Sequence, residues 1–336
     1  MHYIHFGLRT RPFRTTPDVD AYYPATTHET ALAELRRALE DEEGVVLLRG
    51  APGTGKTLLA HLLIENLPEG TRTVFLTNCH FAQRADLVQG ILFDLDLPYQ
   101  EMSEQELRLS LVESCLDHFK ERGRTVIVVD EAHLLSDSHL EELRLLGNLE
   151  GKEGKAVQVV LIGLPSIAET IDRPGLEIFR QRLAVCLKLE PLSIEESADY
   201  LLHQIRRVGG RPEQLLGEDV LDILSHASGG VPRVLNQAAH YAFTLAHQAG
   251  SKIVDAEAAV EAVTRLGLDE EAEEQRSERE PEPTPPAPAM AAFRETASIA
   301  ITPIPTVSLH LSRDTGPPTY IYGEIVPEPL PQQRAG

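Results

Sequence analysis

The chain has 336 residues, and its formal net charge is −21. That length allows two domains with a sizeable core, while the acidic balance disfavours nucleic acid as the main ligand. Three widely spaced cysteines exclude a disulfide framework and a structural zinc knuckle, and the lack of a membrane-length apolar run or a signal-peptide core predicts a soluble, cytoplasmic protein.

Short apolar runs rich in β-branched residues alternate with helical patterns over the first 190 residues. Helix starts are indicated by capping boxes at Thr26–Glu29 and Ser103–Glu106. Since such apolar runs fit strands that are buried on both faces, the alternation predicts a doubly wound parallel sheet of the α/β class. Its ligand site should lie at the carboxyl ends of the strands. The runs occupy residues 45–49, 73–78, 125–130, 157–163 and 184–189.

No strand pattern follows residue 190. A third capping box, Ser193–Glu196, opens a stretch of helical patterns that continues to about residue 268. We therefore predict a nucleotide-binding domain at 1–190, a small all-helical domain at 191–268 and a tail at 269–336.

The composition of the tail differs from that of the rest of the chain. It holds 12 of the 23 prolines and has 12 acidic residues against 5 basic ones, which predicts disorder. Two apolar islands, 298–311 and 319–326, are either docking peptides for a partner or part of the unstructured tail.

A glycine-rich phosphate-binding motif, GAPGTGKT, lies between the first strand and an amphipathic helix. Glycines let backbone N–H groups point at phosphate, and the helix N-terminus adds the positive end of a dipole. In this motif Lys56 would reach the β- and γ-phosphates and the Thr57 hydroxyl would bind Mg²⁺, so the predicted ligands are ATP and Mg²⁺. The loop residues expected to bind the nucleotide are Gly50, Ala51, Pro52, Gly53, Thr54, Gly55, Lys56, Thr57 and Leu58.

Two adjacent acids end the apolar strand VIVVDEAH. A carboxylate at the end of a buried strand is costly without a cation, so Asp130 is expected to share the Mg²⁺ site with Thr57. Glu131 is expected to orient and polarise the attacking water. The nearby His133 either senses the γ-phosphate, links to a partner surface or forms a hydrogen bond within its loop.

One strand, 73–78, separates the phosphate-loop strand from the acidic strand along the chain. This order resembles the additional-strand, catalytic-glutamate class of P-loop ATPases, which implies the spatial strand order 5-1-4-3-2. The resemblance places Asn78 beside Glu131, as a polar switch that holds the glutamate inactive until a partner binds. The alternative is that Asn78 merely ends a strand.

Further motifs make residues 1 to about 265 resemble the AAA+ ATPases of the general secretion pathway protein A (ExeA) type. The family implies an AAA+ sheet domain followed by a helical lid, and an ATP-dependent switch that helps to assemble or position an envelope complex. It also implies a homo-oligomer with a protein client. The motifs are FGLRTRPFRTTPDVDAYYP at 6–24, the phosphate loop, VVDEAHLL at 128–135, LEELRLLGNLE at 140–150, VLIGLP at 160–165, FRQRLAV at 179–185, LEPLS at 189–193 and SGGVPR at 228–233.

The resemblance also assigns roles to two arginines. Arg233, in the GGVPR motif, corresponds to the lid arginine near the γ-phosphate called sensor 2. Arg182 corresponds to the arginine that such ATPases offer to the nucleotide of a neighbouring subunit, with Arg180 as the second candidate; a surface charge is the alternative for Arg182.

The resemblance gives the N-terminal arm a role at the nucleotide too. Pro12 and Phe13 correspond to the segment that packs near the adenine, or else they fasten the N-terminal arm to the body. The sequence departs from the family at Leu164, where a polar sensor 1 residue is common. An apolar side chain cannot bond phosphate or water, so slow turnover is expected.

Two other functions remain open at this stage. One is a DNA-transaction regulator of the transposition type, against which the acidic body argues. The other is a binding module that holds ATP only as a structural ligand, which the apolar Leu164 suggests.

Overall fold

The computed structural model describes residues 2–152 and 154–268. The tail predicted at 269–336, with its two apolar islands, lies outside the described residues, and its predicted disorder remains a prediction.

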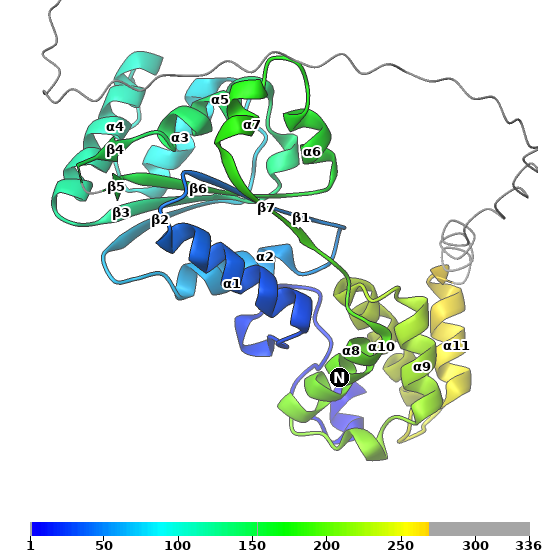
Figure 1. Ribbon diagram of the computed structural model, residues 1–336. Coiled ribbons are helices and arrows are strands. Elements are labelled where there is room, and N and C mark those ends of the chain that lie inside the picture. Colours follow the sequence, from blue (N-terminus) through cyan, green and yellow to red (C-terminus); the bar gives the residue numbers. More distant parts are fainter. Residues whose placement is uncertain (1, 153, 269–336) are drawn as a thin grey trace, which may run out of the picture. The chain divides into compact units, whose positions relative to one another are not determined.

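Five parallel strands form the central sheet (Figure 1). Along the sheet the strands lie in the order β2-β3-β6-β1-β7, and this is the predicted order 5-1-4-3-2 when the five strands are counted along the chain. The strands are β1 (Val45–Gly50), β2 (Thr71–Leu76), β3 (Arg124–Val129), β6 (Val157–Gly163) and β7 (Leu183–Leu189), with a small antiparallel pair, β4 (Glu150–Gly151) and β5 (Gly154–Lys155).

Alternate residues of the strands face two different apolar cores, as period-2 geometry requires. Val46 and Leu48 of β1 pack with α1 and α2 on one face, and Val45 and Leu47 pack with α3, α4 and α5 on the other. Every residue of β6 is buried. The helices of this part are α1 (Thr26–Glu40), α2 (Lys56–Glu65), α3 (Arg84–Asp94), α4 (Glu104–Lys120), α5 (Asp137–Leu146), α6 (Ser166–Ile171) and α7 (Glu177–Arg182).

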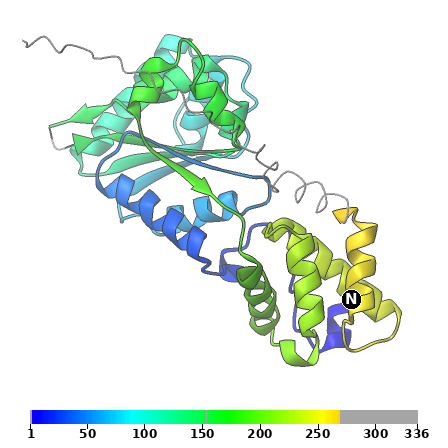
Figure 2. The same ribbon diagram turned by 45° about the vertical axis from the view of Figure 1, so that its right-hand side comes forward.

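A helical part follows β7 and has its own core. Its α-helices are α8 (Ile194–Arg207), α9 (Glu218–Ala227), α10 (Pro232–Gln248) and α11 (Ala256–Arg265), and the described chain also has the 3-10 helices η1 (His2–Phe6), η2 (Val19–Ala21), η3 (Ala132–Leu134) and η4 (Pro212–Gln214). This part corresponds to the predicted helical domain. Figure 2 shows the N-terminal segment lying against these helices.

The start of the chain belongs to the helical core, which differs from the predicted grouping of residues 1–190. Phe6, Leu8 and Phe13 are buried among α8, α9, α10 and α11. Phe6 and Phe13 each pack their rings on Phe243, with centroids 4.9 and 5.5 Å apart. Burial of three large apolar side chains supplies the reason, since each stabilises the fold by about 1.5–3 kcal/mol when fully removed from water.

Two of the three predicted capping boxes are confirmed. Ser103 and Ser193 each accept a hydrogen bond from the backbone N–H three residues later. The third is wrong, because α1 has Ala25 as its N-cap and its first N–H, that of Thr26, donates to Glu196 Oε1 at 2.8 Å. The acceptor for α1 therefore comes from α8, and it ties the helical part to the sheet part.

In the part of the chain that the structure describes, no helix combines the length and the apolar character needed to cross a bilayer.

Candidate nucleotide-binding site

The phosphate-binding motif forms the turn between β1 and α2. Gly53 and Gly55 have φ angles of +80° and +100°, a backbone conformation that residues with a side chain rarely adopt. The first turn of α2 begins at Lys56, so its unpaired N–H groups face the loop. A glycine turn that opens a helix in this way is an anion-binding geometry, and it suits the phosphates of a nucleotide.

Lys56 is buried against its own loop. Its Nζ donates hydrogen bonds to the carbonyl oxygens of Gly50 at 3.0 Å and Ala51 at 2.8 Å. Burial lowers the pKa of this ammonium group, and the carboxylates of Glu131 and Asp130 oppose that shift. Phosphate oxygens would be stronger, charged acceptors for the same amine.

Thr57 and Asp130 meet across the sheet edge. The Thr57 hydroxyl donates to Asp130 Oδ2 at 2.6 Å, and Asp130 is buried. Mg²⁺ is usually held by one or two protein oxygens together with phosphates and water, so this pair fits the predicted Mg²⁺ site. Within the described residues, no group of three or more His, Cys, Asp or Glu side chains could hold a metal alone.

Glu131 follows Asp130 in a left-handed backbone conformation, with φ 53° and ψ 34°. Such strain is uncommon for a residue with a side chain and often marks a functional position. The Glu131 N–H donates to Asp130 Oδ1 at 2.9 Å, and its side chain, 48% exposed, lines the cavity described next. The backbone therefore directs Asp130 into the protein interior and Glu131 toward the cavity.

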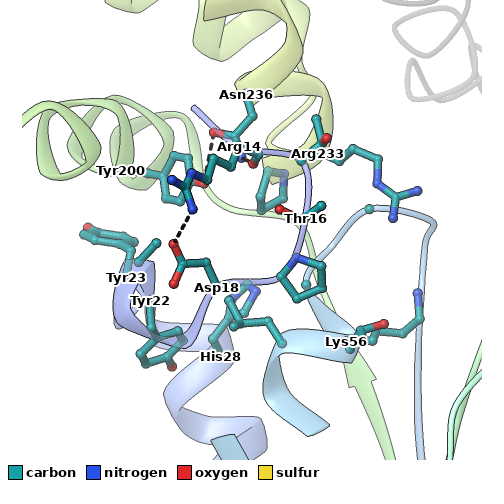
Figure 3. Close-up of a pocket in the computed structure, with 18 of the residues that line it drawn as sticks. Arg14, Thr16, Asp18, Tyr22, Tyr23, His28, Lys56, Tyr200, Arg233 and Asn236 are labelled. Carbon is teal, nitrogen blue, oxygen red and sulfur yellow. Dashed lines mark hydrogen bonds and ion pairs between the residues drawn. The ribbon is translucent and has the colours of Figure 1, made fainter. Parts of the chain in front are cut away.

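A cavity of about 230 Å³ extends from the phosphate loop between the N-terminal arm and the helical part (Figure 3). At its far end, Asp18 Oδ2 forms two ion pairs. It lies 3.8 Å from Nη1 of Arg14 and 3.8 Å from Nη1 of Arg207. Asn236 donates to the Arg14 carbonyl at 2.7 Å and accepts from the Tyr200 hydroxyl at 3.1 Å. The cavity therefore has the phosphate loop for the phosphates of a nucleotide and these polar side chains for its other end.

The chain is similar to known proteins. The chain is 34% identical over 273 residues to general secretion pathway protein A of Aeromonas hydrophila, which covers 81% of this chain and 50% of that protein. A family model described as an AAA domain matches residues 37–171. Residues 37–171 are an AAA domain.

More distant similarities extend over about two thirds of the chain. The RuvB subunit of the Holliday junction branch migration complex of Myxococcus xanthus is 25% identical over 234 residues, covering 66% of this chain and 58% of that subunit. The ORC2 protein of Aeropyrum pernix, solved as ADPNP–ADP complexes, aligns with a TM-score of 0.57 and 16% identity over 71% of this chain and 66% of that chain. This likeness gives the chain the AAA+ fold. The chain spans about half the length of the curated relatives it matches.

Arg233 contacts the phosphate loop of the AAA domain. Its backbone N–H donates to the Gly53 carbonyl at 3.2 Å, and a Cβ on Gly53 would lie 2.8 Å from that of Arg233. Figure 3 shows its guanidinium turned toward the side of the cavity where the Lys56 ammonium lies. The structure therefore brings the predicted lid arginine to the loop, although its role stays a prediction.

Arg182 lies at the other end of the sheet. It precedes β7, whose first residue pairs with Val45 and whose last pairs with Gly50 in the loop. The two pairs lie six residue steps apart along β7, a distance of roughly 20 Å. Arg182 therefore cannot reach the loop of its own chain; Arg180, the second candidate, forms an ion pair with Asp172 at 3.3 Å.

Pro12 and Phe13 have different surroundings in the structure. Pro12 lines the cavity, whereas Phe13 is fully buried in the helical core and does not line it. Phe13 therefore lies where it can fasten the N-terminal arm to the body, which was the alternative role for Pro12 and Phe13.

Asn78 lies two residues beyond β2 and is exposed. Its Oδ1 accepts a hydrogen bond from the His80 N–H at 3.2 Å. The expected contact with Glu131 stays a prediction.

Two further polar groups support the site and were missed in the sequence, one at the phosphate loop and one at Asp130. His28 is buried and its Nε2 donates to the Thr54 carbonyl at 2.7 Å; burial lowers the pKa of the ring, which keeps it neutral. The Cys79 thiol donates to the Asp130 carbonyl at 2.8 Å, and burial raises the pKa of Cys79 to about 12. A histidine in the first turn of α1 and a cysteine after a strand carry no motif that would have revealed these contacts.

Proposed function

We propose that the protein is a Mg²⁺-dependent ATP hydrolase whose nucleotide state assembles or positions a secretion or envelope complex. The observation that carries the hydrolase is the partly buried Thr57–Asp130 hydrogen bond beside Lys56 and Glu131. A hydroxyl, a carboxylate, an ammonium and a second carboxylate at one site are the groups that phosphoryl transfer to water requires.

The side chains divide the reaction between them. Lys56 exchanges its loop carbonyls for phosphate oxygens, and Thr57 and Asp130 would hold Mg²⁺, which neutralises phosphate charge when bound. Glu131 accepts a proton from the attacking water while the water oxygen bonds to the γ-phosphorus. The bond from that phosphorus to the bridging oxygen breaks, and ADP and phosphate leave.

Arg182 completes the site of a neighbouring copy. Because it lies roughly 20 Å along the sheet from its own loop, a catalytic role needs a second subunit. An arginine supplied in trans typically raises kcat by about 10³–10⁵. Hydrolysis then depends on oligomer formation.

A mixing experiment tests the hydrolase and the trans arginine together. We expect Lys56→Ala to lose ATP binding and turnover, and Arg182→Ala to keep ATP binding but lose turnover. Mixed in equal amounts they should regain activity, since Lys56→Ala subunits offer an intact Arg182 to ATP held by the other subunits. ATP turnover and binding of a fluorescent ATP analogue are measured for each sample.

The outcomes separate the two parts of the proposal. Full activity of Lys56→Ala would contradict the hydrolase itself. Full activity of Arg182→Ala, or no recovery on mixing while both variants still form oligomers, would contradict the trans arginine alone. Arg122→Ala, which removes an exposed arginine two residues beyond the end of α4, is the matched control.

The assembly role rests on the similarity to general secretion pathway protein A. Glu131→Gln should bind ATP without completing hydrolysis and so hold its client. We expect envelope or secretion proteins to co-purify with this variant from native lysate with Mg-ATP, and not without nucleotide or with Lys56→Ala. Mass spectrometry identifies them; enrichment of DNA-linked proteins instead would favour the DNA-transaction alternative.

A further inference from the structure

The Glu131 carboxylate has a neighbour within its own loop. His133 Nδ1 lies 3.4 Å from Glu131 Oε2, and the imidazole side chain is 16% exposed. Glu131 is the N-cap of η3 and His133 lies within this short helix, directly after the acidic strand. A polar group so close to a catalytic carboxylate affects where that carboxylate points.

The same nitrogen also faces the end of β6. The backbone N–H of Leu164 donates to His133 Nδ1 at 3.5 Å. Gly163 allows the two segments to approach closely, because a Cβ there would lie only 3.2 Å from the His133 backbone nitrogen. Leu164 is the position whose apolar side chain cannot bond phosphate or water.

One nitrogen cannot serve both partners at once. As an acceptor, unprotonated Nδ1 binds the Leu164 N–H; as a donor, protonated Nδ1 binds the Glu131 carboxylate. Distances of 3.4 and 3.5 Å lie at the long end of the hydrogen-bond range, so neither partner is held firmly. The ring is thus placed between two exclusive arrangements.

We propose that His133 is the positioning residue of this site, alternating between the Leu164 backbone and the Glu131 carboxylate. Bound to Glu131, it orients the carboxylate toward the attacking water; bound to Leu164, it leaves the carboxylate unoriented and fixes the end of β6. The inference deepens the proposed hydrolase and rests on it.

Three substitutions of His133 test the role of Nδ1 in the full-length protein. His133→Asn keeps an amide atom near the position of Nδ1, whereas His133→Gln places its amide nearer that of Nε2, and His133→Ala removes both. We expect Ala and Gln to lower kcat for ATP about tenfold or more while KM stays within about twofold. Asn should stay within about threefold of the wild-type kcat.

Controls distinguish this from a structural role. Melting temperatures report on folding, and His226→Ala removes an exposed histidine at the end of α9 as the matched control. A wild-type kcat in His133→Ala, equal loss in the Asn and Gln variants, or a parallel rise in KM would overturn the proposal. Failure of the hydrolase itself is recognised separately, because the wild-type protein would then show no turnover.

Discussion

Replacing Glu131 with glutamine is expected to lower kcat for ATP by about 10²–10⁴-fold, the usual contribution of a positioned general base. Glutamine keeps the size and the strained backbone position but cannot accept the proton from water. ATP affinity should change by less than about twofold, since Lys56, Thr57 and Asp130 are untouched. Steady-state turnover and equilibrium ATP binding are measured side by side.

Glu69→Gln makes the same chemical change at an exposed glutamate in the loop after α2, and should leave both quantities unaltered. Retained turnover in Glu131→Gln would show that another group takes the proton. Loss of binding together with turnover would show instead that Glu131 supports the loop, and the strained backbone at this residue would then be a structural feature only.

The parts of the site that lie within one stretch of sequence could be predicted. The phosphate loop needs its glycines, lysine and threonine in fixed order, so eight residues are enough to reveal it. The acids at 130 and 131 follow a run of apolar residues that reads as a buried strand. Strand order followed from the family resemblance, since periodicity shows that strands exist but not which are neighbours.

Contacts between distant segments could not be predicted in this way. Phe13 has an apolar side chain that suits either an adenine pocket or a core, and only the fold shows that Phe243 lies against it. Glu196 was expected to cap α8 alone, yet one of its oxygens also caps α1, 170 residues earlier. A carboxylate has two oxygens, and sequence spacing accounts for one of them.

Gly230→Ala is expected to lower the free energy of unfolding by about 3 kcal/mol, combining the left-handed backbone cost with overpacking. Gly230 has a φ of +76°, and a Cβ there would lie 2.0 Å from the Leu192 carbonyl oxygen. Because the Leu192 N–H also donates to the Gly230 carbonyl at 2.9 Å, the two backbones cannot separate without losing that bond. Urea unfolding followed by circular dichroism measures the change.

Gly250→Ala provides the control, because Gly250 has nearly the same φ, +74°, with nothing within 4 Å of its Cβ position. It should cost only the left-handed term, about 1–2 kcal/mol. Gly230 leads directly into Arg233 at the phosphate loop, so its variant should also weaken ATP binding while Gly250→Ala does not. Equal destabilisation by the two substitutions would mean that the Leu192 segment yields easily, and that the link between helical part and loop is looser than these contacts require.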